Sequence, residues 1–361
     1  MHTLRRPLAV LAALSVAAVA AGAEQKADPL AEWQRLQPAS RSARLEIHSR
    51  LALHRPLRLV ALDLGGPLLD DGVHVFRVGE KLSELARATG AVAPVTYWWR
   101  GGTLMGVDAS DRVSAVATPL QRPSGRAVYL GGAFYYATDT EPTSVQDKRD
   151  RMRLVRYDLA TRQASVLVGT GRGYDGAIAT DGKDIFVADR QSLWKYEVSS
   201  GRKQTLPGRF YWPGALALED NRFLIDIHGK GAAVFSAHES DGISLGTSLA
   251  DPSSVIGWSG ETALITQTQF PLKRDTSGSL VVGDYARAAE AITCWRVERA
   301  SSAPTHGVLH TLYRTAPGVR LCDIRIDGRS IAWLEYRDSD HSDYCEKPDA
   351  LVSARLVGAC E

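Results

Sequence analysis

The sequence has little cysteine, and all of it lies at one end. Its four cysteines, Cys294, Cys322, Cys345 and Cys360, fall in the last fifth of 361 residues. No C-x-x-C spacing occurs and no His lies at a zinc-finger distance, which argues against a metal site. No Cys follows the N-terminal apolar run either, so a lipid anchor there has no thiol. An even count in an exported chain predicts two disulfides that fasten the C-terminal end, with three pairings left open.

Long apolar runs are absent after the first residues. Met1 to Arg6 is basic, residues 7–20 are almost wholly apolar, and Ala21-Gly22-Ala23 follows. This pattern predicts a secretory signal over residues 1–23, with an uncleaved anchor as the alternative. No later segment reaches the roughly 20 apolar residues that cross a bilayer. We therefore expect an exported chain, periplasmic or secreted, with no stable membrane insertion once the signal is cleaved.

An excess of one charge is missing as well. The formal net charge is +2 and is spread along the chain, which leaves no electrostatic footprint for nucleic acid. Signatures of common enzyme classes are also lacking: "GWSGE" (257–261) misses G-x-S-x-G, and no G-x-x-x-x-G-K-[ST] phosphate loop occurs. The sequence therefore identifies no cofactor, and it leaves open whether the protein is an enzyme.

What the sequence does contain is a repeated alternation of apolar and polar residues. Residues 177–201 read AIATDGKDIFVADRQSLWKYEVSSG, which are short alternating stretches separated by Asp-Gly and Ser-Ser-Gly turns. This pattern predicts an antiparallel meander, continued by a fourth strand after Gly201. The same order returns over 214–247. Gly176 and Gly214 begin equivalent units at an interval of about 40 residues, which is the length of a propeller blade.

Similar units cover most of the chain. They are found over 57–86, 93–120, 126–169, 253–314 and 319–358, and the unit at 93–120 shows only three strands. The count is six or seven, with seven favoured. The last unit lacks a fourth strand, which the N-terminal region at about 45–62 would supply. Such closure removes exposed sheet edges.

This arrangement resembles the β-propeller. The stretch "YDLATRQASVL" (157–167) is similar to the strand-turn-strand of TolB-like, NHL-like and kelch-like blades, and no single family fits. Glycine pairs such as Gly65-Gly66 and Gly131-Gly132 suggest kelch repeats, but the later units lack them. We predict an all-β fold, a six- or seven-bladed propeller of four-stranded antiparallel blades closed by the N-terminal region. It forms a single domain over 45–361, after a linker or short helix over 24–44.

The loops of this fold predict where a partner binds. Insertions at about 140–152, 268–290 and 338–350 fall between the second and third strands of their units, whereas the first turns are tight. In a meander these loops and the connections between units emerge on one face, here called the long-loop face, and loops on rigid scaffolds often carry binding. The binding-face candidates there are Tyr174, Asp175, Asp189, Arg190, Phe210, Tyr211 and Trp212. The alternative is that Tyr211 and Trp212 pack between blades.

One pair suggests chemistry. Asp226 and His228 are two apart on an expected strand, so both point to one side of the sheet, as an acid and base would. A polar pair at the channel rim is the favoured alternative. We therefore expect a monomeric exported propeller that binds a protein, glycan or cell-envelope component through its long-loop face. A hydrolase or lyase with acid/base residues in the channel, and an accessory module without a small ligand, are the alternatives.

Overall fold

The described part of the chain consists of strands and the turns between them. The computed structural model describes residues 43–89, 94–117, 123–139, 152–171, 177–188, 192–206, 213–219, 222–227, 231–236, 243–244, 253–260, 262–269, 272–274, 276–277, 280–282, 288–296, 309–337, 347–358 and 360. The predicted signal at 1–23 and the linker up to residue 42 lie outside these ranges. Within them, no helix has the length and apolarity that crossing a membrane requires.

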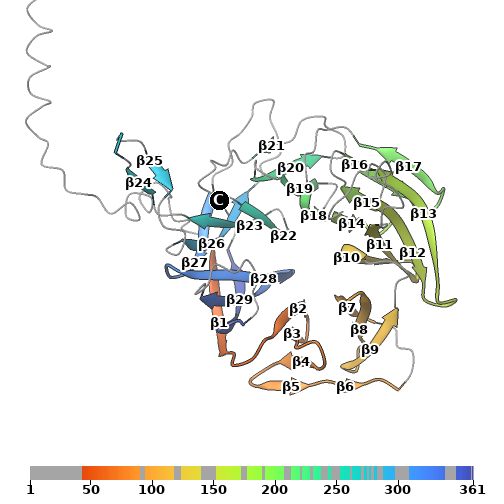
Figure 1. The fold of residues 1–361 in the computed structure, drawn as a ribbon, viewed down its shortest axis with the longest axis horizontal. Coiled ribbons are helices and arrows are strands. Elements are labelled where there is room, and N and C mark those ends of the chain that lie inside the picture. Colours follow the sequence, from red (N-terminus) through yellow and green to blue (C-terminus); the bar gives the residue numbers. More distant parts are fainter. Residues whose placement is uncertain are drawn as a thin grey trace, which may run out of the picture.

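The strands of the described residues form seven four-stranded sheets (Figure 1). The first sheet holds β2 (Arg58–Asp63), β3 (Gly66–Asp70), β4 (Val75–Val78) and β5 (Leu82–Glu84). The second holds β6 (Ala86–Arg87), β7 (Thr96–Arg100), β8 (Thr103–Val107) and β9 (Arg112–Ala117). The third holds β10 (Pro123–Leu130), β11 (Ala133–Asp139), β12 (Met152–Asp158) and β13 (Gln163–Gly171). The fourth holds β14 (Ala177–Thr180), β15 (Ile185–Ala188), β16 (Leu193–Glu197) and β17 (Arg202–Thr205).

The remaining sheets continue in chain order. The fifth holds β18 (Pro213–Glu219), β19 (Arg222–Ile227), β20 (Gly231–Ser236) and β21 (Ile243–Ser244). The sixth holds β22 (Ser253–Ser259), β23 (Thr262–Gln269), β26 (Ala289–Arg296) and β27 (Leu309–Arg314), with a separate hairpin of β24 (Leu272–Arg274) and β25 (Leu280–Val282). The seventh holds β28 (Val319–Asp327), β29 (Ser330–Arg337), β30 (Ala350–Val357) and β1 (Arg44–Ala52). Each sheet matches one of the units expected from the sequence.

Apolar side chains hold successive sheets face to face. Each of seven buried clusters joins two sheets that follow one another, because the alternating apolar residues of a strand all lie on one side. Between the fourth and fifth sheets, for example, the ring centroids of Phe186 and Phe223 lie 5.1 Å apart. Another cluster joins Leu334 of the seventh sheet to Leu69 of the first. Burying each such side chain contributes about 1.5–3 kcal/mol.

One strand from each sheet, the first in chain order except in the second sheet, contacts its counterparts around a common centre. In chain order, β2 contacts β7, followed by β7 with β10, β10 with β14, β14 with β18, β18 with β22 and β22 with β28. The last of these, β28, also contacts β2. Figure 1 shows the sheets following one another around this centre in the same order. We call these seven strands the inner strands.

The N-terminal strand completes the last sheet. β1 pairs antiparallel with β30 along its whole length, from Arg44 opposite Val357 to Ala52 opposite Ala350. The sequence analysis also offered residues up to about 62 as this closing strand. Residues 58–63 instead form the inner strand of the first sheet. The two ends of the described fold therefore lie in one sheet.

The second sheet departs from the predicted antiparallel pattern. The start of β7 lies beside the end of β2, because Thr96 bonds to Asp63. The end of β7 lies near the start of β2, because Arg100 bonds to Asp70, and Asp70 is paired with Arg58. β7 thus runs antiparallel to the inner strand beside it. The fourth strand, β6, comes from before β7 and pairs parallel with β9, so the all-antiparallel prediction is wrong here. The reason is that β5 runs almost directly into β6, which keeps the chain at the outer rim.

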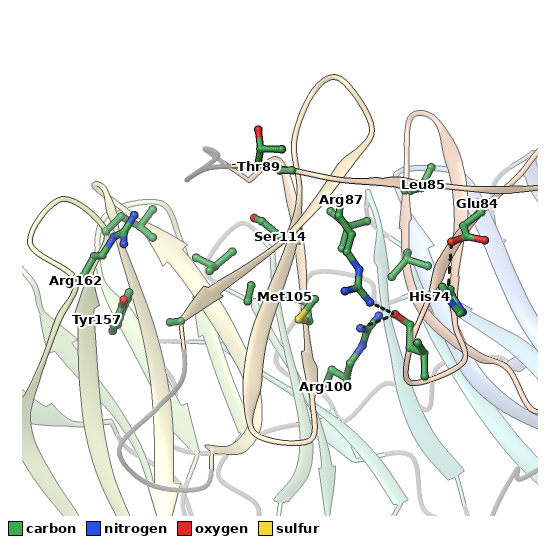
Figure 2. Close-up of a pocket in the computed structure, with 18 residues that line it drawn as sticks. His74, Glu84, Leu85, Arg87, Thr89, Arg100, Met105, Ser114, Tyr157 and Arg162 are labelled. Carbon is green, nitrogen blue, oxygen red and sulfur yellow. Dashed lines mark hydrogen bonds and ion pairs between the residues drawn. The ribbon is translucent and has the colours of Figure 1, made fainter.

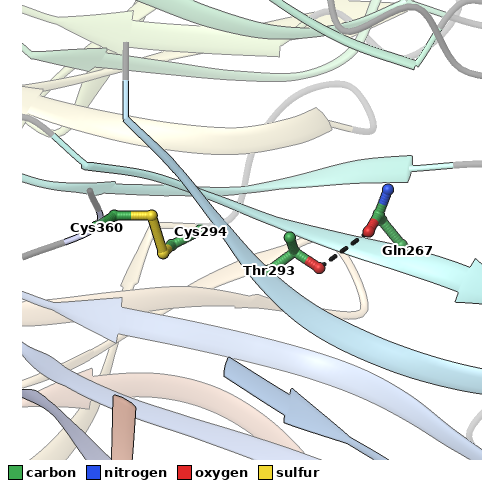
Figure 3. The surroundings of a disulfide bond; sticks show 4 residues. All are labelled: Gln267, Thr293, Cys294 and Cys360. Carbon is green, nitrogen blue, oxygen red and sulfur yellow. Dashed lines mark hydrogen bonds between the residues drawn. A yellow bond between two sulfur atoms is a disulfide. The ribbon is translucent and has the colours of Figure 1, made fainter. Parts of the chain in front are cut away.

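A disulfide ties the sixth sheet to the C-terminus. Cys294 in β26 and Cys360 after β30 are bonded and almost fully buried (Figure 3). Cys322 is disulfide-bonded too, and Cys345 lies outside the described residues. The prediction that disulfides fasten the C-terminal end is confirmed for the Cys294–Cys360 bond.

Candidate functional site

The residues proposed from the sequence lie almost entirely outside the described part of the chain. These are Tyr174, Asp175, Asp189, Arg190, Phe210, Tyr211, Trp212 and His228. Asp226 lies in β19, where the structure describes only the path of the backbone. Their proposed roles therefore stay predictions, and the described residues supply the geometry below.

The long connections occur where the sequence analysis expected them. They join β11 to β12, β23 to β26 and β29 to β30, which are the second and third strands of the third, sixth and seventh sheets. The connection of the sixth sheet carries the β24–β25 hairpin. By contrast, β28 and β29 are joined by Gly328 and Arg329 alone. In the first sheet, the turn at 71–74 between β3 and β4 lies on the long-loop face.

A cavity of about 940 Å³ opens at the long-loop face. It lies beside the first residues of β2, the turn at 71–74, the end of β7 and the β28 bulge, and Lys347 from the connection between β29 and β30 also lines it. We call it the loop-face cavity. Inner strands of three sheets and one long connection therefore converge on it.

Charged side chains surround this cavity, with loose pairing at its rim. Arg58, whose side chain is 71% exposed, lies 3.7 Å from Asp323, and Lys347 pairs with no carboxylate among the described residues. Asp323 has a φ of 47°, in the left-handed region that a residue other than Gly enters at a cost. It lies where the inner strand bulges between Cys322 and Arg325. The rim thus presents two exposed cations, Arg58 and Lys347, to a ligand.

The floor of the loop-face cavity is fixed more tightly. The buried carboxylate of Asp70 accepts hydrogen bonds from Trp98 Nε1 at 2.7 Å and from Arg100 Nε at 2.9 Å. Charge-assisted bonds of this kind are short and strong. Because both Asp70 and Trp98 are buried, Arg100 is held in one position across two sheets.

A second cavity of about 690 Å³, here called the lateral cavity, lies among the outer parts of the first, second and third sheets (Figure 2). Arg87 Nη2 and Arg100 Nη1 both donate to the carbonyl of Val73, at 3.4 and 3.2 Å. His74 lies 3.9 Å from Glu84 at the same end, and Figure 2 shows Arg162 and Tyr157 at the other end. Basic groups therefore line this cavity at both ends.

A third cavity of about 940 Å³ lies at the opposite end of the inner strands. There Arg77 Nη1 donates to Asp63 at 2.5 Å, Arg77 Nη2 donates to Asp111 at 2.5 Å, and the Thr96 hydroxyl donates to Asp63 at 2.7 Å. Burial acts to raise the pKa of Asp63, but the bonds from Arg77 and Thr96 outweigh it and hold the pKa below its ordinary value. This network holds the charges of Asp63 and Arg77 in place.

The described residues offer no metal centre. Nowhere in the described ranges do three His, Cys, Asp or Glu side chains gather as metal ligands would. The lateral cavity was not found by sequence reasoning. The sequence feature that could have indicated this cavity is that the unit at 93–120 shows only three strands, one fewer than its neighbours.

Comparisons with known proteins find likeness in structure only. No family model matches the chain, and no curated protein matches it. The structure of BamB from Moraxella catarrhalis is similar with a TM-score of 0.50 at 11% identity, over 86% of this chain and 99% of that one. The structure of U3-55K is similar with a TM-score of 0.52 at 10% identity, over 89% of this chain and 100% of that one. Both neighbours are β-propellers, and a likeness at such low identity shows that this chain has a propeller-type fold without identifying a specific family.

Proposed function

We propose that the protein is an exported propeller that binds a protein, glycan or cell-envelope component through its long-loop face. The loop-face cavity is the observation that carries this proposal, because inner strands of three sheets and Lys347 converge on it. Binding sites are concave and are commonly built from loops on a rigid scaffold. The loosely paired Arg58 and Lys347 favour a partner with negatively charged groups.

The same cavity favours binding over catalysis. Its buried carboxylate, Asp70, is already engaged by Trp98 and Arg100, so it is not available as a general base. The carboxylate of Asp323 is already paired with Arg58, at 3.7 Å. A rigid floor with a charged rim suits the binding of a ligand that is released without being chemically changed.

Site-specific photocross-linking in the source cells tests this function. A photoreactive amino acid replaces Lys347 at the loop-face cavity or, as the matched control, Lys183, an exposed residue between β14 and β15 on the opposite face. We expect an adduct from position 347 and none from position 183. Equal adducts from both positions, or none from either, would contradict the proposal.

We further propose that the domain spans 45–361 and forms a closed ring of seven blades, exported by a signal cleaved after Ala23. The contact of β2 with β28 and the pairing of β1 with β30 support closure. The buried Cys294–Cys360 bond supports an oxidising compartment. Mass spectrometry of the exported protein tests the signal: a mature N-terminus at Glu24 is expected, and an intact residue 1–23 segment would refute cleavage.

Truncation tests the closure. A chain that begins at Ala43 keeps β1, whereas a chain that begins at Leu53 lacks it and leaves the edge of β30 unpaired. We expect the first chain to unfold cooperatively near the temperature of the parent and the second to aggregate or melt well below it, because an uncovered edge strand is prone to pairing between molecules. Equal melting temperatures would argue against a role of β1 in closure.

A further inference from the structure

We infer that the outer edge of β9, in the second sheet, binds an extended acidic peptide segment as an added strand. β6 pairs only with Arg112 and Val113 of β9. Within the described part of the chain, no strand pairs with the outer edge over 114–117. This site is on the side of the molecule and does not depend on the proposed role of the long-loop face.

The backbone at this edge is directed to receive a strand. The carbonyl of Val113 accepts a hydrogen bond from the N–H of Ala88, which lies beyond the outer edge of β9. Successive residues of β9 alternate from Val113 to Ala115, before a register shift between Ala115 and Ala117, so the N–H and C=O of Ala115 point to the same outer side. Ala115 is exposed and is among the residues that line the lateral cavity. An unpaired edge of this kind is a template for another strand.

The lateral cavity occupies the place of a fourth strand. In the first sheet β5 pairs with Phe76, Arg77 and Val78 of β4, and in the third sheet β13 pairs with β12 from Met152 to Asp158. In the second sheet, residues 114–117 instead face the lateral cavity, which lies between the first and third sheets (Figure 2). A volume of about 690 Å³ beside four consecutive residues suits a short extended segment.

The charges around the cavity select an acidic segment. Arg87 and Arg162 are exposed, and neither pairs with a carboxylate in the described ranges. Arg100 adds a buried Nη2 that has no hydrogen-bond partner. Among the lining residues that the structure describes, Glu84 is the one acidic residue, and it lies near His74. Carboxylates on the added strand would therefore meet arginines at both ends of the cavity.

The lining between these charges includes apolar side chains. Leu85, Met105 and Val113 line the cavity, and Met105 and Val113 are buried. Because alternate residues of a strand point to opposite sides, a segment that alternates acidic and apolar residues places its carboxylates near the arginines and its apolar side chains against this lining. A segment of this pattern is the predicted partner.

Selection of random short peptides displayed on phage tests the inference. The full exported protein is the bait, and the best enriched peptide is then synthesised and its dissociation constant measured by fluorescence anisotropy. We expect enrichment of alternating Asp or Glu and apolar residues. The double substitution Arg87→Glu and Arg162→Glu is expected to weaken binding roughly tenfold or more, since it reverses two exposed charges. Arg153→Glu, at an exposed β12 residue outside the cavity, is the matched control and should leave binding unchanged.

Two further measurements separate strand addition from simple charge attraction. Methylation of alternate backbone nitrogens in the peptide should abolish binding, because it removes the donors of the new ladder. Hydrogen exchange should be fast at Ala115 in the free protein and slow in the complex. Enrichment of basic peptides or of none, undiminished binding of the methylated peptide, slow exchange in the free protein, or a dimer formed through this edge would each overturn the inference.

Discussion

At the scale of single residues, buried charges act as fixed links between sheets. Asp63 in β2 is bound by Arg77 of the same sheet and by Thr96 of the next one, and Asp70 binds Trp98 and Arg100 in the same way. Removing one partner of such a pair leaves the other without compensation, which costs more than the pair itself contributes. These residues therefore offer sharp tests of how the first two sheets are joined.

The Asp63 network makes the free energy of unfolding depend on pH in the acidic range. The pKa of Asp63 in the folded state lies below its ordinary value of 3.8. The ionised carboxylate therefore stabilises the fold fully above pH 3.8, and this stabilisation is lost as the pH falls through the lowered pKa. We expect Asp63→Asn to reduce the free energy of unfolding near neutral pH and to flatten its decline below about pH 4. Urea unfolding across this range measures both effects. Glu80→Gln, at an exposed turn, controls for the loss of one negative charge, and an unchanged slope in Asp63→Asn would refute the argument.

Glu335 is the residue on which the seventh sheet depends. Its buried carboxylate accepts hydrogen bonds from Arg50 in β1, Tyr313 in β27 and Trp333 Nε1, at 2.5, 2.5 and 3.1 Å. Burial and the bond to Glu335 raise the pKa of Tyr313 to about 12. The network therefore binds the N-terminal strand and the sixth sheet to one side chain.

We predict that Glu335→Gln lowers the free energy of unfolding by about 2 to 3 kcal/mol, because it weakens three bonds to a buried acceptor. Arg50→Met should cost less than Glu335→Gln, since the Arg50 side chain is 56% exposed and the buried Glu335 carboxylate keeps its bonds from Tyr313 and Trp333. Urea denaturation of the two variants provides the comparison. Equal losses would mean that the carboxylate serves Arg50 alone.

At the scale of strands, the inner positions are crowded. The register shifts once in each of β2, β10, β18, β22 and β28, so bulges recur in strands nearest the centre. In β22 the bulge contains Gly257 with a φ of 155°, and a Cβ there would lie 3.0 Å from Ile326 in the next inner strand. A bulge increases the local twist and lets neighbouring strands approach.

Gly257→Ala is therefore expected to destabilise the fold by about 1 to 3 kcal/mol through strain and contact with Ile326. Gly79→Ala is the matched control, because a Cβ at Gly79 meets nothing within 4 Å. Thermal unfolding of both variants measures the difference. A melting temperature for Gly257→Ala equal to that of Gly79→Ala would show that the inner strands tolerate a side chain at this position.

Strand positions were predictable because the alternation of side chains is a local property. The stretch 177–201 shows three strands directly, and the structure places β14, β15 and β16 in them. Strand direction was not predictable in the second sheet. Gly65-Gly66 and Gly101-Gly102 look alike in sequence, yet one turn follows a strand that runs one way and the other follows β7, which runs the opposite way. Alternation carries no information about direction.

The candidate site was predictable only in outline. Tight first turns and long later loops indicated which face is elaborated, and the loop-face cavity opens there. The grouping of Arg58, Asp323 and Lys347 joins residues that are far apart in the chain, so it depends on tertiary structure. The unpaired outer edge of β9 was likewise not predictable, because it results from the direct connection of β5 to β6.

At the scale of the whole molecule, the disulfide connects parts that fold as different sheets. Cys294 and Cys360 are separated by 66 residues, and closing a loop of that length restricts the unfolded chain by about 4 kcal/mol. We expect the double substitution Cys294→Ser and Cys360→Ser to lower the urea midpoint strongly while the sheets are kept. Treating the parent protein with a reductant provides the control, and a loss below about 1 kcal/mol would show that native packing already supplies this restraint.

The pairing of Arg44 with Val357 has a consequence for the order in which the sheets are encoded. Since the beginning and end of the fold are neighbours in one sheet, a short linker between them would make the backbone circular without disturbing a ladder. New termini could then be opened at a tight turn of another sheet, such as Gly182 between β14 and β15, away from the long-loop face. A circularly permuted gene could thus start with a different sheet and still encode the same seven sheets in the same cyclic order.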